Sequence, residues 1–277
     1  MIRIWHQSMT VLEDLPGYAK LMKEHAQRVC EVGTTVDLHG LMPGTFTHDF
    51  APLQSAASPW LYQLTCLQIV ENVIRAQQEG YDAVAMSCFG DPHLDICRSL
   101  VDIPVLSASE TSLRVASTSA QAFGILVPDE AAAKRARARA KAYGFEARIA
   151  IVAACTPGLT EYELERGFSG DATLIARLTE QLRKMVAAGA DIIIPAEGVL
   201  NSVLVHNRIS HVDGVPVFDS FGSVMASAEM LVKLHRSTGL RNAKTGAYAK
   251  PPAEFVRHFR QVAIKALQEA DARDRQM

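Results

Sequence analysis

The sequence lacks the features that mark nucleic-acid binding, membrane insertion and disulfide-stabilised folds. It has no basic tract, and 28 Lys and Arg residues against 30 Asp and Glu give a net charge of −2, so we expect neither a nucleic-acid partner nor attraction to a membrane. No apolar run approaches the roughly 20 residues of a membrane span, and we expect no signal peptide. The five cysteines are odd in number and contain no Cys-x-x-Cys pair, which argues against disulfides and zinc knuckles. These absences predict a cytoplasmic protein with a small-molecule substrate.

Further absences limit the cofactors. The nine histidines show no His-x-x-x-His or His-Glu-x-x-His spacing, so no metal site is predicted. There is no Gly-x-Gly-x-x-Gly or Walker loop to hold a nucleotide, and no Gly-x-Ser-x-Gly nucleophile elbow. We therefore expect chemistry that needs no cofactor.

What is present is a regular alternation of short apolar runs and amphipathic helical stretches. The chain has 277 residues, of which 48% are apolar and 21% charged, as in a globular protein. This alternation predicts an α/β fold with parallel sheets. The expected strands are 2–5, 32–38, 83–86, 105–106, 124–127, 147–153, 192–194 and 215–218.

One segment occurs twice, and its copies differ at a position of chemical interest. Residues 80–89 read Gly-Tyr-Asp-Ala-Val-Ala-Met-Ser-Cys-Phe, and residues 189–198 read Gly-Ala-Asp-Ile-Ile-Ile-Pro-Ala-Glu-Gly. Each is an apolar run entered through Gly-x-Asp and left through a polar turn, as when a buried parallel strand delivers a side chain to the carboxyl edge of a sheet. Cys88 and Glu197 match, so we expect a thiol and a carboxylate to flank one small site.

The repeat extends beyond the strand, because each copy follows a long helical stretch and precedes a second apolar run containing Pro-Val. We predict two pseudo-symmetric, Rossmann-like domains with the active site in the cleft between them. Residues 1–106 with 215–277 form the first domain, and residues 107–214 form the second. From Pro251 onward, Phe255, Phe259 and Leu267 have the spacing of a helix that packs against a core.

Cys88 is the first candidate for chemistry. It lies just past a predicted strand, and Pro92 suits the first turn of a helix. Backbone N–H groups in such a turn stabilise an anion, so we expect a lowered thiol pKa. The alternative is a buried cysteine that fills an apolar gap. Its neighbours Ser87 and Phe89 are expected to contact the substrate.

Glu197 is the second candidate. A carboxylate that follows three isoleucines is poorly explained as a solvated surface charge. The alternative is a turn glutamate that favours a helix N-terminus, but the match with Cys88 favours a functional role. Asn201 and Ser202 follow about one helical turn later and are expected to assist Glu197 or to bind substrate.

Polar residues also follow other predicted strands, at the edge where parallel sheets bind ligands. His6, Gln7 and Ser8 follow the first strand and are candidates for binding a substrate carboxylate or amide. Asp219 and Ser220 follow the run 215–218, and the repeat duplicates their placement. The alternative for each group is an ordinary polar loop.

The segment 85–92, Ala-Met-Ser-Cys-Phe-Gly-Asp-Pro, resembles the first cysteine motif of the aspartate/glutamate/hydantoin racemase superfamily, and is most similar to its hydantoin and allantoin racemase branch. Segments 189–194 and 215–219 resemble the second half of that family. The resemblance implies two α/β halves, an active site between them, no cofactor and a homo-oligomer. Racemases of the family use two cysteines on opposite faces of a substrate α-carbon: one thiolate removes a proton and the other thiol returns one.

This sequence departs from that pattern at the second cysteine, where it has Glu197. Cys88 matches the first. The family often has an Asn-Pro turn where this chain has residues 6–8, and a threonine near Pro128. A carboxylate can serve as acid or base, and unequal pKa values suit a directional reaction. We predict an isomerase: a cofactor-independent racemase or epimerase of a small carboxylate, hydantoin or ureide, with Cys88 and Glu197 as its acid–base pair.

Two alternatives stay open. On the same fold, Cys88 would serve a hydrolase, decarboxylase or isomerase of a related amide, imide or dicarboxylate, for example as a nucleophile while Glu197 activates water. A small-ligand binding protein would have the two-lobed scaffold without needing a reactive thiol.

Overall fold

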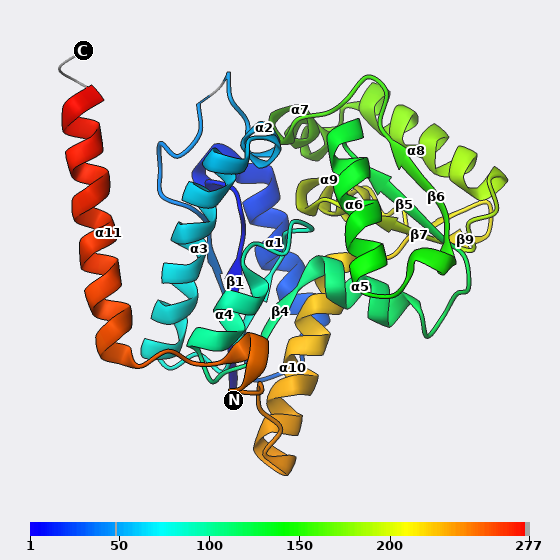
Figure 1. Ribbon diagram of the computed structural model, residues 1–277. Coiled ribbons are helices and arrows are strands. Elements are labelled where there is room, and N and C mark those ends of the chain that lie inside the picture. The colour runs from blue at the N-terminus through cyan, green and yellow to red at the C-terminus, as the bar shows by residue number, and fades with distance from the viewer. Residues whose placement is uncertain (48, 275–277) are drawn as a thin grey trace.

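Two α/β halves, each built on its own parallel sheet, make up the body of the protein (Figure 1). The computed structural model describes residues 1–47 and 49–274. The first sheet has the order β2-β1-β3-β4 and the second the order β6-β5-β7. The strands are β1 (Ile2–Gln7), β2 (Thr34–His39), β3 (Ala83–Met86), β4 (Val105–Ser107), β5 (Phe123–Val127), β6 (Ile149–Ala154) and β7 (Ile192–Pro195). The predicted fold class is confirmed, and these strands lie where the apolar runs predicted them.

The run 215–218 is the exception among the predicted strands. Only Val215–Pro216 forms a strand, β9, and it pairs antiparallel with a strand that was not predicted, β8 (His211–Val212). The residues between them, Asp213 and Gly214, both have positive φ (49° and 82°), as a tight Asp-Gly hairpin turn requires. The expected parallel pairing is reduced to one bridge between Val217 and Ile193.

Helices cover both faces of each sheet. Those of the first 120 residues are α1 (Pro16–Val29), α2 (Pro52–Ala57), α3 (Pro59–Gln78), α4 (Leu94–Leu100) and α5 (Ala108–Ala116). Those that follow are α6 (Glu130–Ala142), α7 (Glu161–Glu165), α8 (Ala172–Ala187), α9 (Gly198–His206), α10 (Ser220–Thr238) and α11 (Ala253–Asp274). In the first half α1 and α10 pack on one face of the sheet and α3 and α4 on the other. Side-chain caps fix several helix starts: the Asp171 carboxylate, for example, accepts from the Leu174 N–H at the start of α8.

The sequence repeat is a structural repeat. Gly80 and Gly189 both have positive φ (76° and 91°), which only glycine adopts without strain. Two residues later, Asp82 accepts a hydrogen bond from the Arg3 N–H at 2.8 Å, and Asp191 accepts one from the Ala122 N–H at 2.7 Å. Each aspartate thus ties the start of its strand to the neighbouring central strand. The two copies therefore project their last residues from equivalent edges.

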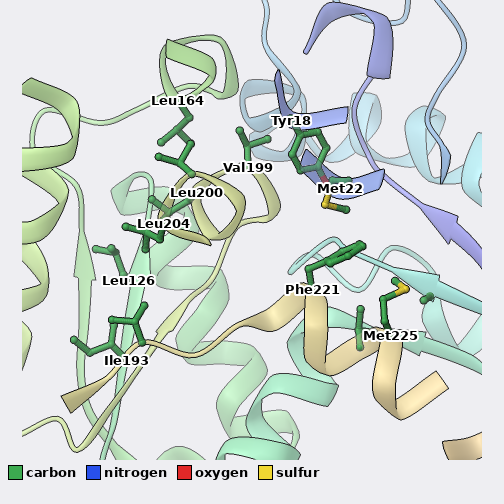
Figure 2. Packing of buried hydrophobic residues seen from close by; sticks show 14 of the residues in the cluster. Tyr18, Met22, Leu126, Leu164, Ile193, Val199, Leu200, Leu204, Phe221 and Met225 are labelled. Carbon is green, nitrogen blue, oxygen red and sulfur yellow. The ribbon is translucent and has the colours of Figure 1, made fainter. Parts of the chain in front are cut away.

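One apolar core runs from the first sheet into the second half. It includes Ile4 of β1 and Ile193 of β7, with side chains of α1, α9 and α10 between them. Figure 2 shows Tyr18 of α1 beside Val199 of α9, and Phe221 of α10 below them. The shared core fixes the two sheets relative to each other, so the strand ends of both halves face one space.

The C-terminal segment forms the predicted helix, α11, but the prediction that this helix packs on the core is wrong. Figure 1 shows α11 standing away from the body beside α3. Phe255 and Phe259 are 55% and 71% exposed. An ion pair between Arg260 and Glu71 (2.9 Å) connects the helix to α3. Among the described residues, none of the helices combines the length and apolarity needed to cross a bilayer.

Candidate active site

A cavity of about 190 Å³ lies at the carboxyl ends of the strands of both sheets. Its walls include Ser8 after β1, residues 87–90 after β3, Pro128 after β5 and residues 196–198 after β7. Helices α2, α6 and α7 complete it. Sites for drug-sized ligands measure roughly 300–1,000 Å³, so this cavity fits a smaller molecule.

The turns that carry Cys88 and Glu197 touch each other. A Cβ atom at Gly198 would lie 2.7 Å from the carbonyl oxygen of Ser87. Only a glycine therefore allows the residue after Glu197 to approach the residue before Cys88 this closely. Cys88 and Glu197 both line the cavity, so the expectation that the repeat brings thiol and carboxylate to one site agrees with this geometry.

The Cys88 thiol is protonated at neutral pH, contrary to the expected lowering of its pKa. Its sulfur accepts from the Gly90 N–H at 3.2 Å and contacts the Met9 sulfur at 3.5 Å. Burial raises the pKa of Cys88 to about 12, and the Gly90 N–H and the Arg139 charge offset only part of that effect. The predicted helical turn is also absent here, since α4 begins at Leu94, two residues after Pro92.

A network of polar groups from both halves lies beside Cys88. The Asp91 carboxylate accepts from the hydroxyls of Ser107 and Tyr143, the latter at 2.6 Å, and lies 3.4 Å from the Arg139 guanidinium. Burial raises the pKa of Asp91 despite these partners. Arg139 lines the cavity, and its Nε is buried without a partner among the described residues. As a cation on the cavity wall, Arg139 can donate to an oxygen atom of a ligand.

Glu197 has two roles in the structure. It is the N-cap of α9, where its carboxylate accepts from the N–H groups of Val199 (3.0 Å) and Leu200 (2.6 Å). It also lines the cavity. Burial raises the pKa of its carboxyl, while the helix N–H groups lower it in part. The side chain is therefore the helix cap that one interpretation of the sequence expected, and it lies at the cavity where the other interpretation placed a functional group.

Residues that sequence reasoning missed also line the cavity, among them Tyr18 of α1, Arg139 of α6 and Glu161 of α7. Glu161 is 4% exposed. It follows Thr160 in a Thr-x-x-Glu capping box, and this signal marks the start of a helix without indicating a site. Burial and then the charge of Glu197 raise the pKa of Glu161.

The structure brings Ser8, Ser87 and Phe89 to the cavity wall with the two central candidates. His6 lies behind the wall: it is fully buried, and its Nε2 lies 2.8 Å from the Ser87 hydroxyl. Burial, with a smaller effect of His39, lowers the pKa of His6 to about 3, so the ring is neutral. Gln7 is buried too, and its amide donates to the carbonyl of Ser8.

The other predicted binding residues do not line the cavity. The Asn201 amide oxygen accepts from the Ser220 N–H, and the Ser202 hydroxyl donates to the Gly198 carbonyl. Asp219 is the N-cap of α10 and pairs with His25 at 2.6 Å. The Ser220 hydroxyl donates to the Pro195 carbonyl. These contacts hold the start of α10 against β7 and α9, so the four residues support the wall that carries Glu197.

No group of three or more His, Cys, Asp or Glu side chains in the described part of the chain is arranged to hold a metal ion. The chemistry that the cavity wall itself offers is proton transfer. It has one neutral thiol, two carboxyl groups of raised pKa and two arginines, Arg135 and Arg139.

Comparison with known proteins agrees with this architecture. The model of the Asp/Glu/hydantoin racemase family matches residues 18–228. The chain is 27% identical to hydantoin racemase of Paenarthrobacter aurescens over 190 residues, which is 68% of this chain and 76% of that protein. Allantoin racemase from Pseudomonas fluorescens has the same fold, with a TM-score of 0.71 and 22% identity over 90% of this chain and 97% of that one. Allantoin racemase from Klebsiella pneumoniae also has this fold, with a TM-score of 0.70 and 22% sequence identity. The match covers 91% of this chain and 94% of that one.

Proposed function

The chain belongs to the Asp/Glu/hydantoin racemase family, and from this premise we propose that it is a cofactor-independent racemase or epimerase of a small carboxylate, hydantoin or ureide. Cys88 and Glu197 are its two acid–base groups. The observation that carries the proposal is that the two residues line one cavity from matching turns of the two halves, and that these turns touch.

The protonation states of Cys88 and Glu197 before substrate binds favour one direction of proton transfer. The raised pKa of Cys88 leaves a neutral thiol, which is an acid. Burial raises the pKa of Glu197, but the helix N–H groups oppose that effect and favour the carboxylate, which is a base. Glu197 removes the α-proton, the electron pair delocalises into the adjacent carbonyl, and Cys88 donates its proton to the opposite face of the carbon. The resulting thiolate and protonated Glu197 are the form that acts on the other enantiomer.

The rest of the wall suits the charge that develops on the substrate. Arg139 and the hydroxyls of Ser8, Ser87 and Ser109 line the cavity and can donate to a carbonyl or carboxylate oxygen. The apolar side chains Leu53, Phe89 and Leu113 surround the remainder. This combination favours a substrate with a polar head and a small apolar substituent.

Deuterium uptake in D2O tests the acid–base pair on single enantiomers of 5-substituted hydantoins, allantoin and small amino acids. Wild type should interconvert the enantiomers of a substrate and place deuterium on the α-carbon. We expect C88S and E197Q each to lose interconversion by about 10²–10⁴-fold. Each should still exchange the α-proton of the enantiomer that faces its remaining base, and the two variants should prefer opposite enantiomers.

C30S, which changes a cysteine outside the cavity, and E180Q, which changes an exposed glutamate, should behave like wild type. Interconversion without deuterium uptake would reject the mechanism. A mass adduct on Cys88 with net conversion of substrate would favour the nucleophilic alternative, which the raised thiol pKa disfavours.

A further inference from the structure

The cavity holds a second carboxyl group that the two-base mechanism does not use. Glu161 is the first residue of α7 in the second half, and its carboxylate accepts from the N–H of Leu53 in α2 at 3.2 Å. Figure 1 shows α2 and α7 meeting above the two halves. Glu161 and Glu197 reach the same cavity from different elements of the second half.

In the part of the chain that the structure describes, neither carboxyl has a cation to balance it. Among the described residues, no lysine, arginine or histidine forms an ion pair with Glu161 or Glu197. Arg139, on the same cavity wall, lies 3.4 Å from Asp91 instead. Two uncompensated carboxylates in one enclosed space are costly, and such pairs retain a proton.

The hydrogen bonds indicate which group keeps the proton. Glu197 accepts from two N–H groups of α9 at 3.0 and 2.6 Å, which favours its charged form. Glu161 accepts from one neighbouring element, the N–H of Leu53, at the longer distance of 3.2 Å. The proton therefore belongs on Glu161 and the negative charge on Glu197.

The surroundings of Glu161 support the same assignment. Burial raises its pKa most, then the charge of Glu197, and Asp129 raises it further. The titratable groups that face Glu161 or line its cavity are Glu197, Asp129, Cys88, Arg135, Arg139 and the hydroxyls of Tyr18, Tyr62 and Tyr162. None of them places a positive charge against the Glu161 carboxyl.

We propose that Glu161 and Glu197 form a proton-sharing carboxyl pair on the second-half wall of the cavity, in which Glu161 holds the proton while the cavity is empty. The pair then carries one negative charge instead of two, located on the group that removes the substrate proton. Glu161 is a positioning residue: it sets the protonation state of Glu197. This inference rests on the proposed function only in naming Glu197 as the base.

Carbon-13 NMR of the whole chain, labelled at the glutamate carboxyl carbons, tests the pair without substrate. Wild type should show a carboxyl that stays protonated above pH 6, well beyond the ordinary glutamate pKa of about 4.3. E161Q should remove this signal. E197Q should keep it but move its titration to lower pH, because the neighbouring charge is gone. E180Q, which removes an exposed carboxyl outside the cavity, should change neither feature.

The pair is rejected if no carboxyl of wild type titrates above pH 6, if the signal survives in E161Q, or if E197Q leaves its titration unchanged. The comparison of E197Q with wild type tests the pair even if E161Q fails to fold. Because no substrate is needed, a failure to find deuterium exchange would reject the proposed function and leave this result standing. Conversely, exchange activity with no shared proton would reject the pair alone.

Discussion

At the scale of the residue, the environment of Cys88 differs from what its place in the chain suggests. It follows a strand, accepts one backbone N–H and lies near Arg139, and the last two features favour a thiolate. Burial outweighs these effects and leaves a thiol. In a two-base mechanism this is useful, because one group must begin as an acid while the other begins as a base.

The raised pKa of Cys88 predicts slow alkylation. At pH 7.5 we expect iodoacetamide to modify Cys88 at least about tenfold more slowly than a free thiol of pKa about 8.5, because only the thiolate reacts. The rate should continue to rise with pH past 9 instead of reaching a plateau there. Peptide mapping by mass spectrometry measures it, with C88S as the blank. A plateau at or below neutral pH would show that the thiol is activated.

At the scale of the element, the start of α9 does three things at once. Glu197 caps the helix, Gly198 brings its first turn against the Ser87 carbonyl, and Val199 enters the shared core. Helix geometry thus fixes how far Glu197 stands from the turn that carries Cys88. The site is set by a backbone contact as much as by its two side chains.

G198A tests this contact. The added Cβ would meet the Ser87 oxygen at 2.7 Å and the Tyr18 hydroxyl at 3.2 Å, so the turns must separate. We expect a loss of about 1–3 kcal/mol in the free energy of unfolding and at least about tenfold slower interconversion. The matched control is G158A, whose Cβ would find its nearest neighbour at 3.4 Å. Equal activity and stability of the two variants would show that the turns can move without consequence.

At the scale of the whole molecule, burial of Glu161 makes stability depend on pH. Its folded pKa lies above the unfolded value, so the native state binds the proton more tightly. Stability from this group is therefore lost as the pH rises from the unfolded pKa of about 4.3 through the folded pKa. This loss of stability arises because packing of both halves keeps the carboxyl groups of the cavity out of water.

E161Q should therefore gain stability over wild type at high pH. We expect an advantage of at least about 1 kcal/mol at pH 8 that shrinks toward pH 5. Urea unfolding of both proteins at several pH values measures it, and E180Q should track wild type throughout. A difference that does not change with pH would mean that Glu161 titrates alike in the folded and unfolded chain.

Much of the fold could be predicted because its signals are local. Apolar runs bounded by Gly-x-Asp and polar turns predicted the parallel strands, and the repeat predicted two matching halves. The same signals located Cys88 and Glu197 at strand ends, where parallel topology delivers each residue to the carboxyl edge of its own sheet. Family resemblance at the cysteine motif added a reaction type, and the match over residues 18–228 confirms the family.

The remaining features depend on which segments pack together, and no local pattern records that. Glu161 and Arg139 both lie on helices. In the sequence, Glu161 looks like an ordinary acidic residue of a first helical turn, and Arg139 looks like an exposed basic residue. The Asp-Gly turn converted a predicted parallel strand into a hairpin, and α11 has a core-like apolar face that remains exposed. The sequence alone predicted that Cys88 and Glu197 follow matching strands of the two halves. Only the tertiary structure decided their protonation, because a pKa depends on burial and on neighbours that are distant along the chain.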